Sequence, residues 1–300
     1  MDKFKQFIDI NWWSNVNKRS IESWISNFGS EQELAHFILN NILFYNSVQL
    51  KSYTRTLINQ LKEIVYVKSR SENNYSLITD EVLESEWINY INGTRFMPAA
   101  LIGDSGSSAF KVIGYWRTEL QGANISSIEN LENDYQNGIR RFVLVDDFSG
   151  SGEQIIKVLE QKISLNGKEI EVGKIIDYKP DIELVIAAYI IHQNSRIRIN
   201  GVYPNIKIMY VNILDDSFNF LNINSFMYEP YNIEKRKHFV SSIRTIMARL
   251  MDNDSSLQEL EKYVLHIPVV FEHGCPNNTL LLLFAHTNDW KQLFRRGEEV

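Results

Sequence analysis

The chain has 300 residues, of which 44% are hydrophobic and 12% aromatic, enough apolar surface for the core of one large or two modest domains. Its formal net charge of -6, from 31 basic and 37 acidic residues, excludes a protein that grips a phosphate backbone through a strong overall positive charge. The single Cys275 excludes an intramolecular disulfide framework and a zinc site built from cysteines.

The first 92 residues predict an all-helical region. Between residues 20 and 67, apolar residues recur at spacings of three and four, without the alternation of a strand. Ser30, with Glu33 three residues on, is a candidate capping box at a helix start. A polar connection near residue 70 and a further helix at residues 81–91 complete this region, which we delimit as residues 1–92.

From residue 93 to residue 300, strand patterns alternate with helix patterns and predict an α/β domain. Continuous apolar strands, each followed by a helix, are typical of a parallel sheet covered on both faces, and we expect a doubly wound arrangement. The predicted strands are residues 99–103, 140–147, 182–191 and 206–214, and the predicted helices are residues 107–120, 152–163 and 233–251. Two further strands are expected around a loop at residues 276–278, the second of them at 279–286.

The longest apolar runs, at residues 182–191 and 279–286, are too short to cross a bilayer. The first residues also lack the charged, apolar and small-residue order of a signal peptide. We therefore expect a cytoplasmic protein that does not contact a membrane.

Two aspartates end the strand that begins near Phe142. Ligands of open parallel sheets bind outside the carboxyl ends of the strands, so Asp146 and Asp147 stand where a ligand would lie. Adjacent strand residues point to opposite faces, and for this reason the two acids are not expected to share a proton. Carboxylates accept the hydroxyl hydrogens of a ribose diol, whereas they repel a phosphate.

A loop of small residues follows these acids and predicts a phosphate site. Residues 149–152 lead into a helix at about Glu153, so backbone N–H groups and the helix N-terminus can face an anion, and the Ser151 hydroxyl can donate as well. A diol site beside a phosphate site describes a pocket for ribose 5-phosphate. Two other interpretations stay open: an unrelated α/β loop with acids at its strand end by chance, and a metal site.

The stretch from Val143 to Gln154 resembles the signature of type I phosphoribosyltransferases, in which apolar residues precede two acids and a loop with a hydroxyl residue and glycine. In that family the acids bind the ribose hydroxyls of phosphoribosyl pyrophosphate and the loop binds its 5-phosphate. The resemblance implies that Asp146 and Asp147 are the catalytic acids. It assigns the phosphate to Ser149, Gly150, Ser151, Gly152, Glu153 and Gln154. Gln154 stands where threonine or serine is usual, so one hydroxyl donor is lost.

An earlier loop has the same order of strand, small residues and helix. In the family that the chain resembles, the loop after the first core strand binds pyrophosphate, commonly with a basic residue. The corresponding residues are Asp104, Ser105, Gly106, Ser107 and, about one turn into the next helix, Lys111. Asp104 stands where a cation is wanted, and a serine-capped helix start without a ligand is the alternative.

The C-terminal segment resembles the ending of phosphoribosyltransferase-like proteins from bacterial conflict and anti-phage gene clusters. The residues that carry this resemblance are Pro276, Asn277, Asn278, Thr279, Trp290, Leu293, Phe294 and Arg295. His273, Asn277 and Asn278 are candidates for reading a base, and the alternative is a turn in which asparagine side chains cap the backbone. Cys275, close to His273, offers a candidate thiolate.

The resemblance implies chemistry at ribose C1, through an oxocarbenium-like transition state, on phosphoribosyl pyrophosphate or a nucleotide with Mg²⁺ on the pyrophosphate. The histidines show no metal-ligand spacing, so no further metal site is predicted. Three functions follow: an enzyme, a catalytically inactive nucleotide sensor or scaffold that signals to a partner, and a toxin-like effector of an anti-phage system. The last two imply a protein partner from the same gene cluster, with nucleic acid left open.

The segment at residues 118–138 is long and polar enough to form a lid over a substrate.

Overall fold

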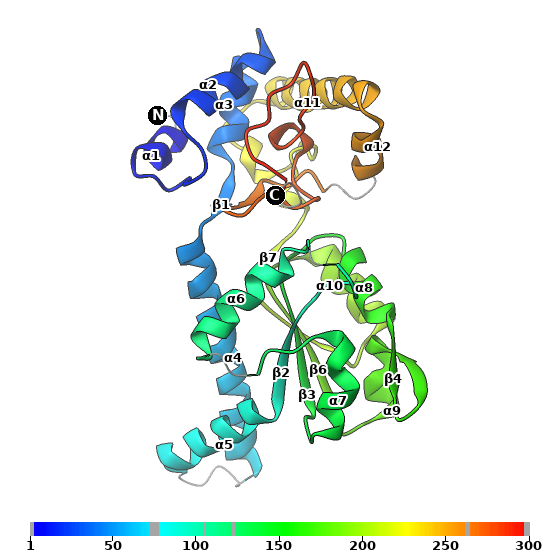
Figure 1. Cartoon of the computed structure of the whole chain (residues 1–300). Helices are drawn as coiled ribbons and strands as arrows, with labels where there is room; N and C mark the ends of the chain where they lie inside the picture. The colour runs from blue at the N-terminus through cyan, green and yellow to red at the C-terminus, as the bar shows by residue number, and fades with distance from the viewer. Residues whose placement is uncertain (1–2, 73–77, 105, 122–123, 262–264, 297–300) are drawn as a thin grey trace. The chain divides into compact units, whose positions relative to one another are not determined.

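The computed structural model describes residues 3–72, 78–104, 106–121, 124–261 and 265–296, with the side chains of 259–261 left aside. The chain divides into two compact units (Figure 1). The sheet unit comprises residues 48–213, and the terminal unit combines residues 1–47 with 214–300. The divisions therefore fall at 47/48 and 213/214, and not at the predicted boundary of 92/93, because part of the predicted helical region packs on the sheet.

Within the described residues, the sheet unit is built on four strands in the order β2-β3-β6-β7. β3 pairs in parallel with both of its neighbours, which places Val143 opposite Phe96 of β2 and Val185 of β6. The bounds are Thr94–Pro98 for β2, Arg141–Ser149 for β3, Glu183–His192 for β6 and Lys207–Leu214 for β7. The strands lie in the sheet in the order in which they occur along the chain. A doubly wound sheet reverses its strand order part-way across, so the doubly wound arrangement that we expected is not found here.

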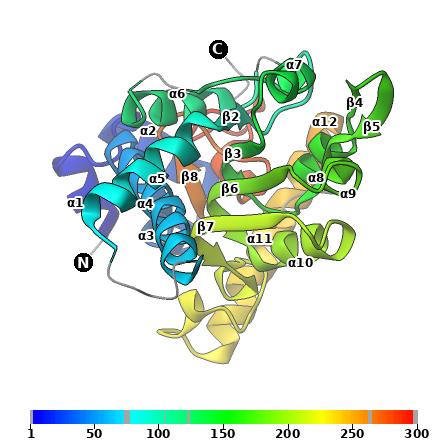
Figure 2. The same cartoon turned by 90° about the horizontal axis from the view of Figure 1, so that it is seen from below.

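Helices cover both faces of the sheet, as predicted (Figure 2). On one face, Thr54 Oγ1 of α4 lies 2.6 Å from Tyr189 Oη of β6, and the Trp116 ring of α6 is 4.9 Å from the Phe96 ring of β2. On the other face, helices α7 to α10 close a core around Phe142. The bounds are α4 Ser47–Glu72, α5 Asp80–Asn92, α6 Ala109–Glu119, α7 Leu131–Gln136, α8 Glu153–Glu160, α9 Ile175–Tyr178 and α10 Gln193–Val202.

The first strand of the sheet lies earlier than predicted. Residues 99–103 are apolar, but the chain leaves the sheet after Pro98, and the N–H of Ala99 makes a last bond to the carbonyl of Val145 at 2.9 Å. The sequence pattern also missed an antiparallel hairpin of β4 (Lys162–Leu165) and β5 (Lys168–Glu171). Its turn is Asn166-Gly167, both with positive φ, and an Asn-Gly pair is the usual sequence signal for a hairpin.

The terminal unit joins the two ends of the chain around a core rich in aromatic rings. The indole N–H groups of Trp24 and Trp290, both fully buried, donate to the carbonyl of Leu282 at 2.8 and 3.1 Å. The bounds are α1 Lys3–Asp9, α2 Lys18–Ile25, α3 Gln32–Asn40, β1 Leu43–Tyr45, α11 Ile233–Asn253, α12 Ser255–Glu261 and β8 Val269–Phe271. Strands β1 and β8 pair in parallel, with Phe44 opposite Val270.

Three sequence expectations for the terminal unit are wrong. Strand β1 interrupts the region predicted to be all-helical, because its partner β8 comes from the far end of the sequence. Helix α3 begins after Glu31 without a side-chain cap, so Ser30 is not its N-cap. The apolar run at 279–286 contains a 3₁₀ turn at Leu281–Leu283 instead of a strand, and its leucines fill the core from a compact turn.

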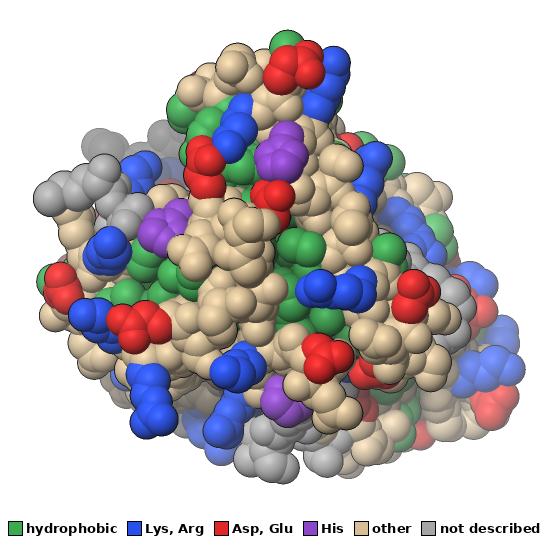
Figure 3. Space-filling view, turned by 90° about the horizontal axis from the view of Figure 1, so that it is seen from above, with side chains coloured by type: hydrophobic (Ala, Val, Ile, Leu, Met, Phe, Trp, Pro, Cys, Tyr) green, Lys and Arg blue, Asp and Glu red, His purple; other side chains and the backbone are tan. Residues whose placement is uncertain are grey.

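Acidic and basic side chains are interspersed on the face that Figure 3 draws, and they do not gather there into a patch of one sign. This mixed distribution agrees with the small net charge of the whole chain. No helix in the described part of the chain combines the length and the apolar character that a membrane span requires.

Candidate functional site

Strand β3 carries the two aspartates to the carboxyl edge of the sheet. The strand is apolar from Phe142 to Val145 and buried on both faces, as expected for an inner parallel strand. Asp146 is 1% exposed and Asp147 4% exposed, although carboxylates are rarely buried without a partner. The fold therefore holds two consecutive acids in its interior, at the end of an inner strand.

Asp146 lies in an environment that disfavours its charge. Its Oδ1 accepts the backbone N–H of Asp147 at 3.0 Å, whereas its Oδ2 has no hydrogen-bond partner. Burial, the negative charge of Asp147 and a hydrogen bond between the two carboxyl groups raise the pKa of Asp146 well above its ordinary value. The two carboxyl groups therefore influence each other's charge at the strand end, and our expectation that they do not share a proton stays a prediction.

Asp147 connects the end of β3 to the loop that follows β2. The hydroxyl of Ser108 donates to Asp147 Oδ1 at 2.9 Å, and Ser108 immediately precedes α6. The sequence placed Ser108 in a loop of small residues but gave it no role. This contact brings the two predicted loops to the same edge of the sheet.

The loop after β3 is shaped by Gly152. Its φ of 77° lies in the left-handed region, and a Cβ built there would approach Ser195 of α10 to 3.0 Å from Oγ and 3.3 Å from the carbonyl oxygen. The loop then opens helix α8 at Glu153, with no side chain capping the helix. The first backbone N–H groups of α8 are the kind that bind an anion at a helix start.

Two of the predicted phosphate ligands have other partners. The Ser149 hydroxyl is buried and lies 2.7 Å from the Ser195 hydroxyl, and the Gln154 amide donates to the carbonyl of Ala99 at 3.4 Å. The Ser151 hydroxyl accepts the N–H of Glu153 at 3.4 Å. The groups that remain at the loop are mainly the backbone amides from Gly150 to Gly152, beside the Glu153 N–H, which already donates to Ser151.

The loop after β2 is held partly by its own acid. Asp104 Oδ1 accepts the N–H of Gly106 at 3.0 Å, and Ser107 Oγ accepts the N–H of Ala109 at 3.3 Å. Lys111 is exposed on α6, and Ser105 lies outside the described residues. A negative charge thus occupies the Gly106 amide of this loop. The N-cap residue of α6, Ser108, does not cap the helix with its side chain, so the alternative of a serine-capped helix start is not confirmed.

A comparison with protein families matches residues 21–296 to the family model described as PRTase-CE. The chain belongs to the PRTase-CE family. Because this is a phosphoribosyltransferase family, the resemblance to phosphoribosyltransferases that we predicted is confirmed. A search of curated proteins found no match.

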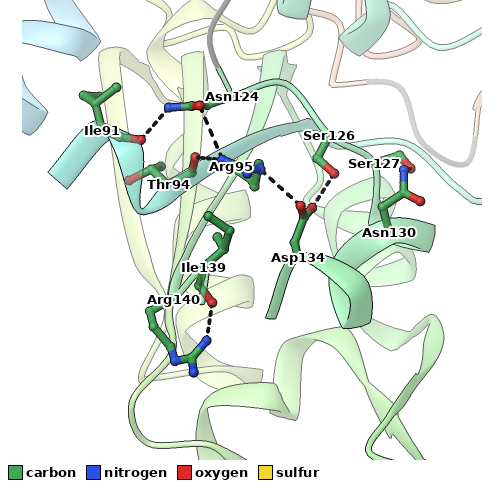
Figure 4. A network of polar contacts seen from close by, with 10 residues as sticks. All are labelled: Ile91, Thr94, Arg95, Asn124, Ser126, Ser127, Asn130, Asp134, Ile139 and Arg140. Atoms are coloured by element: carbon green, nitrogen blue, oxygen red, sulfur yellow. Dashed lines mark hydrogen bonds and ion pairs between the residues drawn. The ribbon is translucent and has the colours of Figure 1, made fainter. Parts of the chain in front are cut away.

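In this PRTase-CE chain the segment between α6 and β3 extends the edge of the sheet. The N–H of Phe96 donates to the carbonyl of Asn124 at 2.8 Å, and the N–H of Ser126 donates to the carbonyl of Phe96 at 3.0 Å. Figure 4 shows how Arg95 reaches Asp134, at 3.1 Å, while Ser126 also donates to that carboxylate. The described residues from 124 to 136 are therefore fastened to β2, which is not the arrangement of a loose lid.

A cavity of about 200 Å³ opens beside the loop after β2. Its lining includes Leu101, Phe110 and Ile128, together with the acids Asp104 and Glu129. Neither aspartate of β3 lines it, so it is a separate hollow from the candidate diol site. Its apolar and acidic lining does not suit a phosphate group.

The remaining candidates of the PRTase-CE chain lie in the terminal unit. The His273 ring stacks on Phe271 at 5.3 Å, Asn277 Oδ1 accepts from Arg296 at 3.0 Å, and the carbonyl of Asn278 accepts two backbone N–H groups. The Asn277 side chain thus contacts an arginine side chain, and these Asn278 contacts involve its backbone carbonyl, so neither shows an asparagine side chain that caps the backbone. Cys275 is 4% exposed and burial raises the pKa of its thiol, so a reactive thiolate is disfavoured.

Proposed function

We propose that the sheet unit binds a pentose 5-phosphate and that the bound compound reacts at ribose C1. The observation that carries this proposal is the carboxylate oxygen Asp146 Oδ2, which is buried at the strand end without a hydrogen-bond partner. Native proteins rarely leave such an atom unsatisfied, because an unpaired buried acceptor costs about 1–3 kcal/mol. A ligand that donates a hydroxyl hydrogen at this point removes that cost.

A ribose 5-phosphate group matches the donors and acceptors of the site. The two ribose hydroxyls donate to Asp146 and Asp147, and the phosphate accepts from the backbone amides of residues 150–153 at the start of α8. Gly152 supports this assignment, since its positive φ turns the chain into α8. The membership in a phosphoribosyltransferase family supports the same ligand class, of which phosphoribosyl pyrophosphate and nucleotides are the candidates.

The proposed chemistry breaks the bond between C1 and its leaving group. The electron pair of that bond departs with the leaving group, positive charge develops on the ribose ring, and an incoming group supplies a new electron pair to C1. The carboxylates beneath the ribose favour the positive charge and hold the sugar in one orientation. Positioning and electrostatics supply the rate, which is why the site needs few groups that transfer protons.

The residues present fit an Mg²⁺ ion that enters with the substrate. Among the described residues, no group of three His, Cys, Asp or Glu side chains is gathered as a metal site of its own. Mg²⁺ is commonly held by one or two carboxylates together with substrate phosphates, and the aspartates at the end of β3 offer such carboxylates. When bound, the ion would neutralise the charge of the departing pyrophosphate.

We place this activity in an anti-phage defence system, with the chain as a cytoplasmic effector controlled by a protein partner. The support is the resemblance of the C-terminal segment, from Pro276 to Arg295, to proteins of such gene clusters. An effector that consumes nucleotides would need a partner to restrain it until infection.

A catalytically inactive nucleotide sensor is the second candidate function. It is favoured by Asp104, whose carboxylate holds the Gly106 amide in the loop where a phosphoribosyltransferase binds pyrophosphate. A negative charge at that point weakens pyrophosphate binding without affecting the ribose 5-phosphate site. The sensor would bind a nucleotide and pass its state to a partner.

Turnover distinguishes the two functions. The protein is incubated with phosphoribosyl pyrophosphate plus a panel of nucleobases, or with each common nucleotide, in the presence of Mg²⁺, and the products are separated by chromatography. The enzyme releases pyrophosphate or a free base, and the double variant Asp146→Asn/Asp147→Asn abolishes this release. Asp181→Asn, which removes an exposed acid paired with Arg140, is the matched control and retains activity.

Binding of a nucleotide without turnover would select the sensor. Failure of wild-type protein to bind any pentose phosphate, measured by calorimetry over the same panel, would refute both functions.

A further inference from the structure

Helix α10 lies against the proposed phosphate loop. It follows β6, the strand beside β3, and the register places Ile191 of β6 opposite Ser149. Ser195 in the first turn of α10 is fully buried, and its hydroxyl is 2.7 Å from that of Ser149. The space that Gly152 leaves without a side chain is filled by this same serine. The first turn of α10 therefore forms one wall of the loop.

The same face of α10 brings a cation to the loop. Arg198 follows Ser195 by three residues, a spacing that places both side chains on one side of a helix. Its guanidinium donates from Nη1 to the carbonyl of Ser151 at 3.4 Å, and the side chain is exposed to solvent. Within the described part of the chain, no carboxylate forms an ion pair with Arg198. Its positive charge is therefore available beside residues 150–153.

The loop itself is short of positive charge for a phosphate dianion. The Ser149 hydroxyl and the Gln154 amide are directed to other partners, at 2.7 and 3.4 Å. Glu153 adds a carboxylate at the start of α8, which Lys157 offsets through an ion pair of 2.8 Å. Backbone amides and the partial charge of one helix are what remain. A guanidinium presents five N–H donors in a planar fork, so Arg198 can keep its bond to Ser151 and still bind phosphate oxygens.

We propose that Arg198 is a phosphate ligand of this site, and that it recognises the phosphomonoester dianion of a pentose 5-phosphate. The inference rests on the proposed function and extends it with a residue from a different helix, outside the signature of the loop. It also explains how the loop tolerates glutamine in place of a hydroxyl residue at position 154. Arg198 thus sets the preference of the site for phosphorylated over unphosphorylated pentoses.

Isothermal titration calorimetry with ribose 5-phosphate and with ribose tests this inference. The variants are Arg198→Gln, which removes the charge, Arg198→Lys, which keeps it, and Arg196→Gln as the matched control. Arg196 is two residues away and donates to the Tyr210 hydroxyl at 3.0 Å, so its loss removes the same charge from α10 away from the loop. Thermal unfolding of each variant confirms that the fold is kept.

We expect Arg198→Gln to weaken ribose 5-phosphate binding about tenfold, the usual effect of losing one charge-assisted hydrogen bond. Arg198→Lys should recover part of the affinity, and Arg196→Gln should bind as the wild type does. Unchanged affinity of Arg198→Gln would overturn the inference and leave the proposed function standing. An equal loss for ribose and ribose 5-phosphate would overturn it as well, because Arg198 would then only brace the loop. A wild-type protein that binds no ribose 5-phosphate would refute the proposed function itself.

Discussion

Replacing Asp146 by asparagine should make the protein more stable while it removes ligand binding. Asp146 is 1% exposed, its Oδ2 has no partner, and its pKa is raised by burial and by the charge of Asp147. Asparagine keeps the shape and the acceptor for the Asp147 N–H, and its amide can donate to the Asp147 carboxylate. The substitution therefore removes a buried carboxyl group whose charged form is disfavoured, and it satisfies a neighbouring acceptor.

The size of the effect follows from the cost of an unsatisfied buried group, about 1–3 kcal/mol. For a domain the size of the sheet unit, 1 kcal/mol changes the unfolding temperature by roughly 2–4 °C, so we expect a rise of about 2–12 °C at pH 7.5. Because the folded pKa of Asp146 is raised, the folded protein holds a proton that the unfolded chain releases near its ordinary pKa of 3.8. Stability is thus lost as pH rises through the folded pKa, and the advantage of asparagine disappears at low pH.

The assay is thermal unfolding by circular dichroism across a pH series, with Asp134→Asn as the control. Asp134 is also a buried acid of the sheet unit, but Arg95 compensates its charge at 3.1 Å. Asp134→Asn leaves the Arg95 guanidinium without its carboxylate partner, and it should lower the free energy of unfolding by about 2 kcal/mol. If Asp146→Asn lowers the unfolding temperature at pH 7.5 as Asp134→Asn does, the acid is a structural member of the core and our reasoning about the site fails.

Three further outcomes are expected. Gly152→Ala should lower the free energy of unfolding, measured in urea, by about 1–3 kcal/mol, because a residue with a Cβ is strained at a φ of 77° and its Cβ meets Ser195. An unchanged urea midpoint would show that the loop is adaptable. Burial and the charge of Arg244 lower the pKa of His266 to about 4, so the unfolded chain binds a proton that the folded chain refuses, and stability falls as pH drops from about 6.5 to 4. His266→Asn, which tolerates the φ of 51°, should flatten this part of the urea-unfolding profile, and a profile that stays as steep would contradict the assignment. Cys275 should react with a maleimide in the native protein far more slowly than in the unfolded chain, and rapid native labelling would reopen the thiolate hypothesis.

Strand β3 and its loop were predictable because the signal is local. Four apolar residues, two acids and a run of small residues specify an inner strand, its end and a helix start without any contact from elsewhere in the chain. The helices that begin at Ala109, Glu153 and Ile233 were found for the same reason, since apolar residues recur in each at helical spacing. In the same way, β6 followed from its continuous apolar run.

The division of the chain depends on contacts between distant residues, and the sequence pattern does not contain them. Strand β1 looks like part of a helical region until Val269–Phe271 pairs with it. Ser195 and Arg198 belong to a helix of weak amphipathic pattern, and only the pairing of β3 with β6 brings that helix to the phosphate loop. A search for polar residues just after each strand would have found Ser195, but no local signal distinguishes Arg198 from Arg196.

A crystal structure with ribose 5-phosphate is the most direct test of whether the end of β3 and its loop hold a pentose 5-phosphate. We expect the ribose hydroxyls at hydrogen-bond distance from Asp146 Oδ2 and the Asp147 carboxylate, and the phosphate against the amides of residues 150–153. A ligand bound elsewhere, for example in the cavity beside Phe110, with Asp146 Oδ2 still unpartnered, would contradict it.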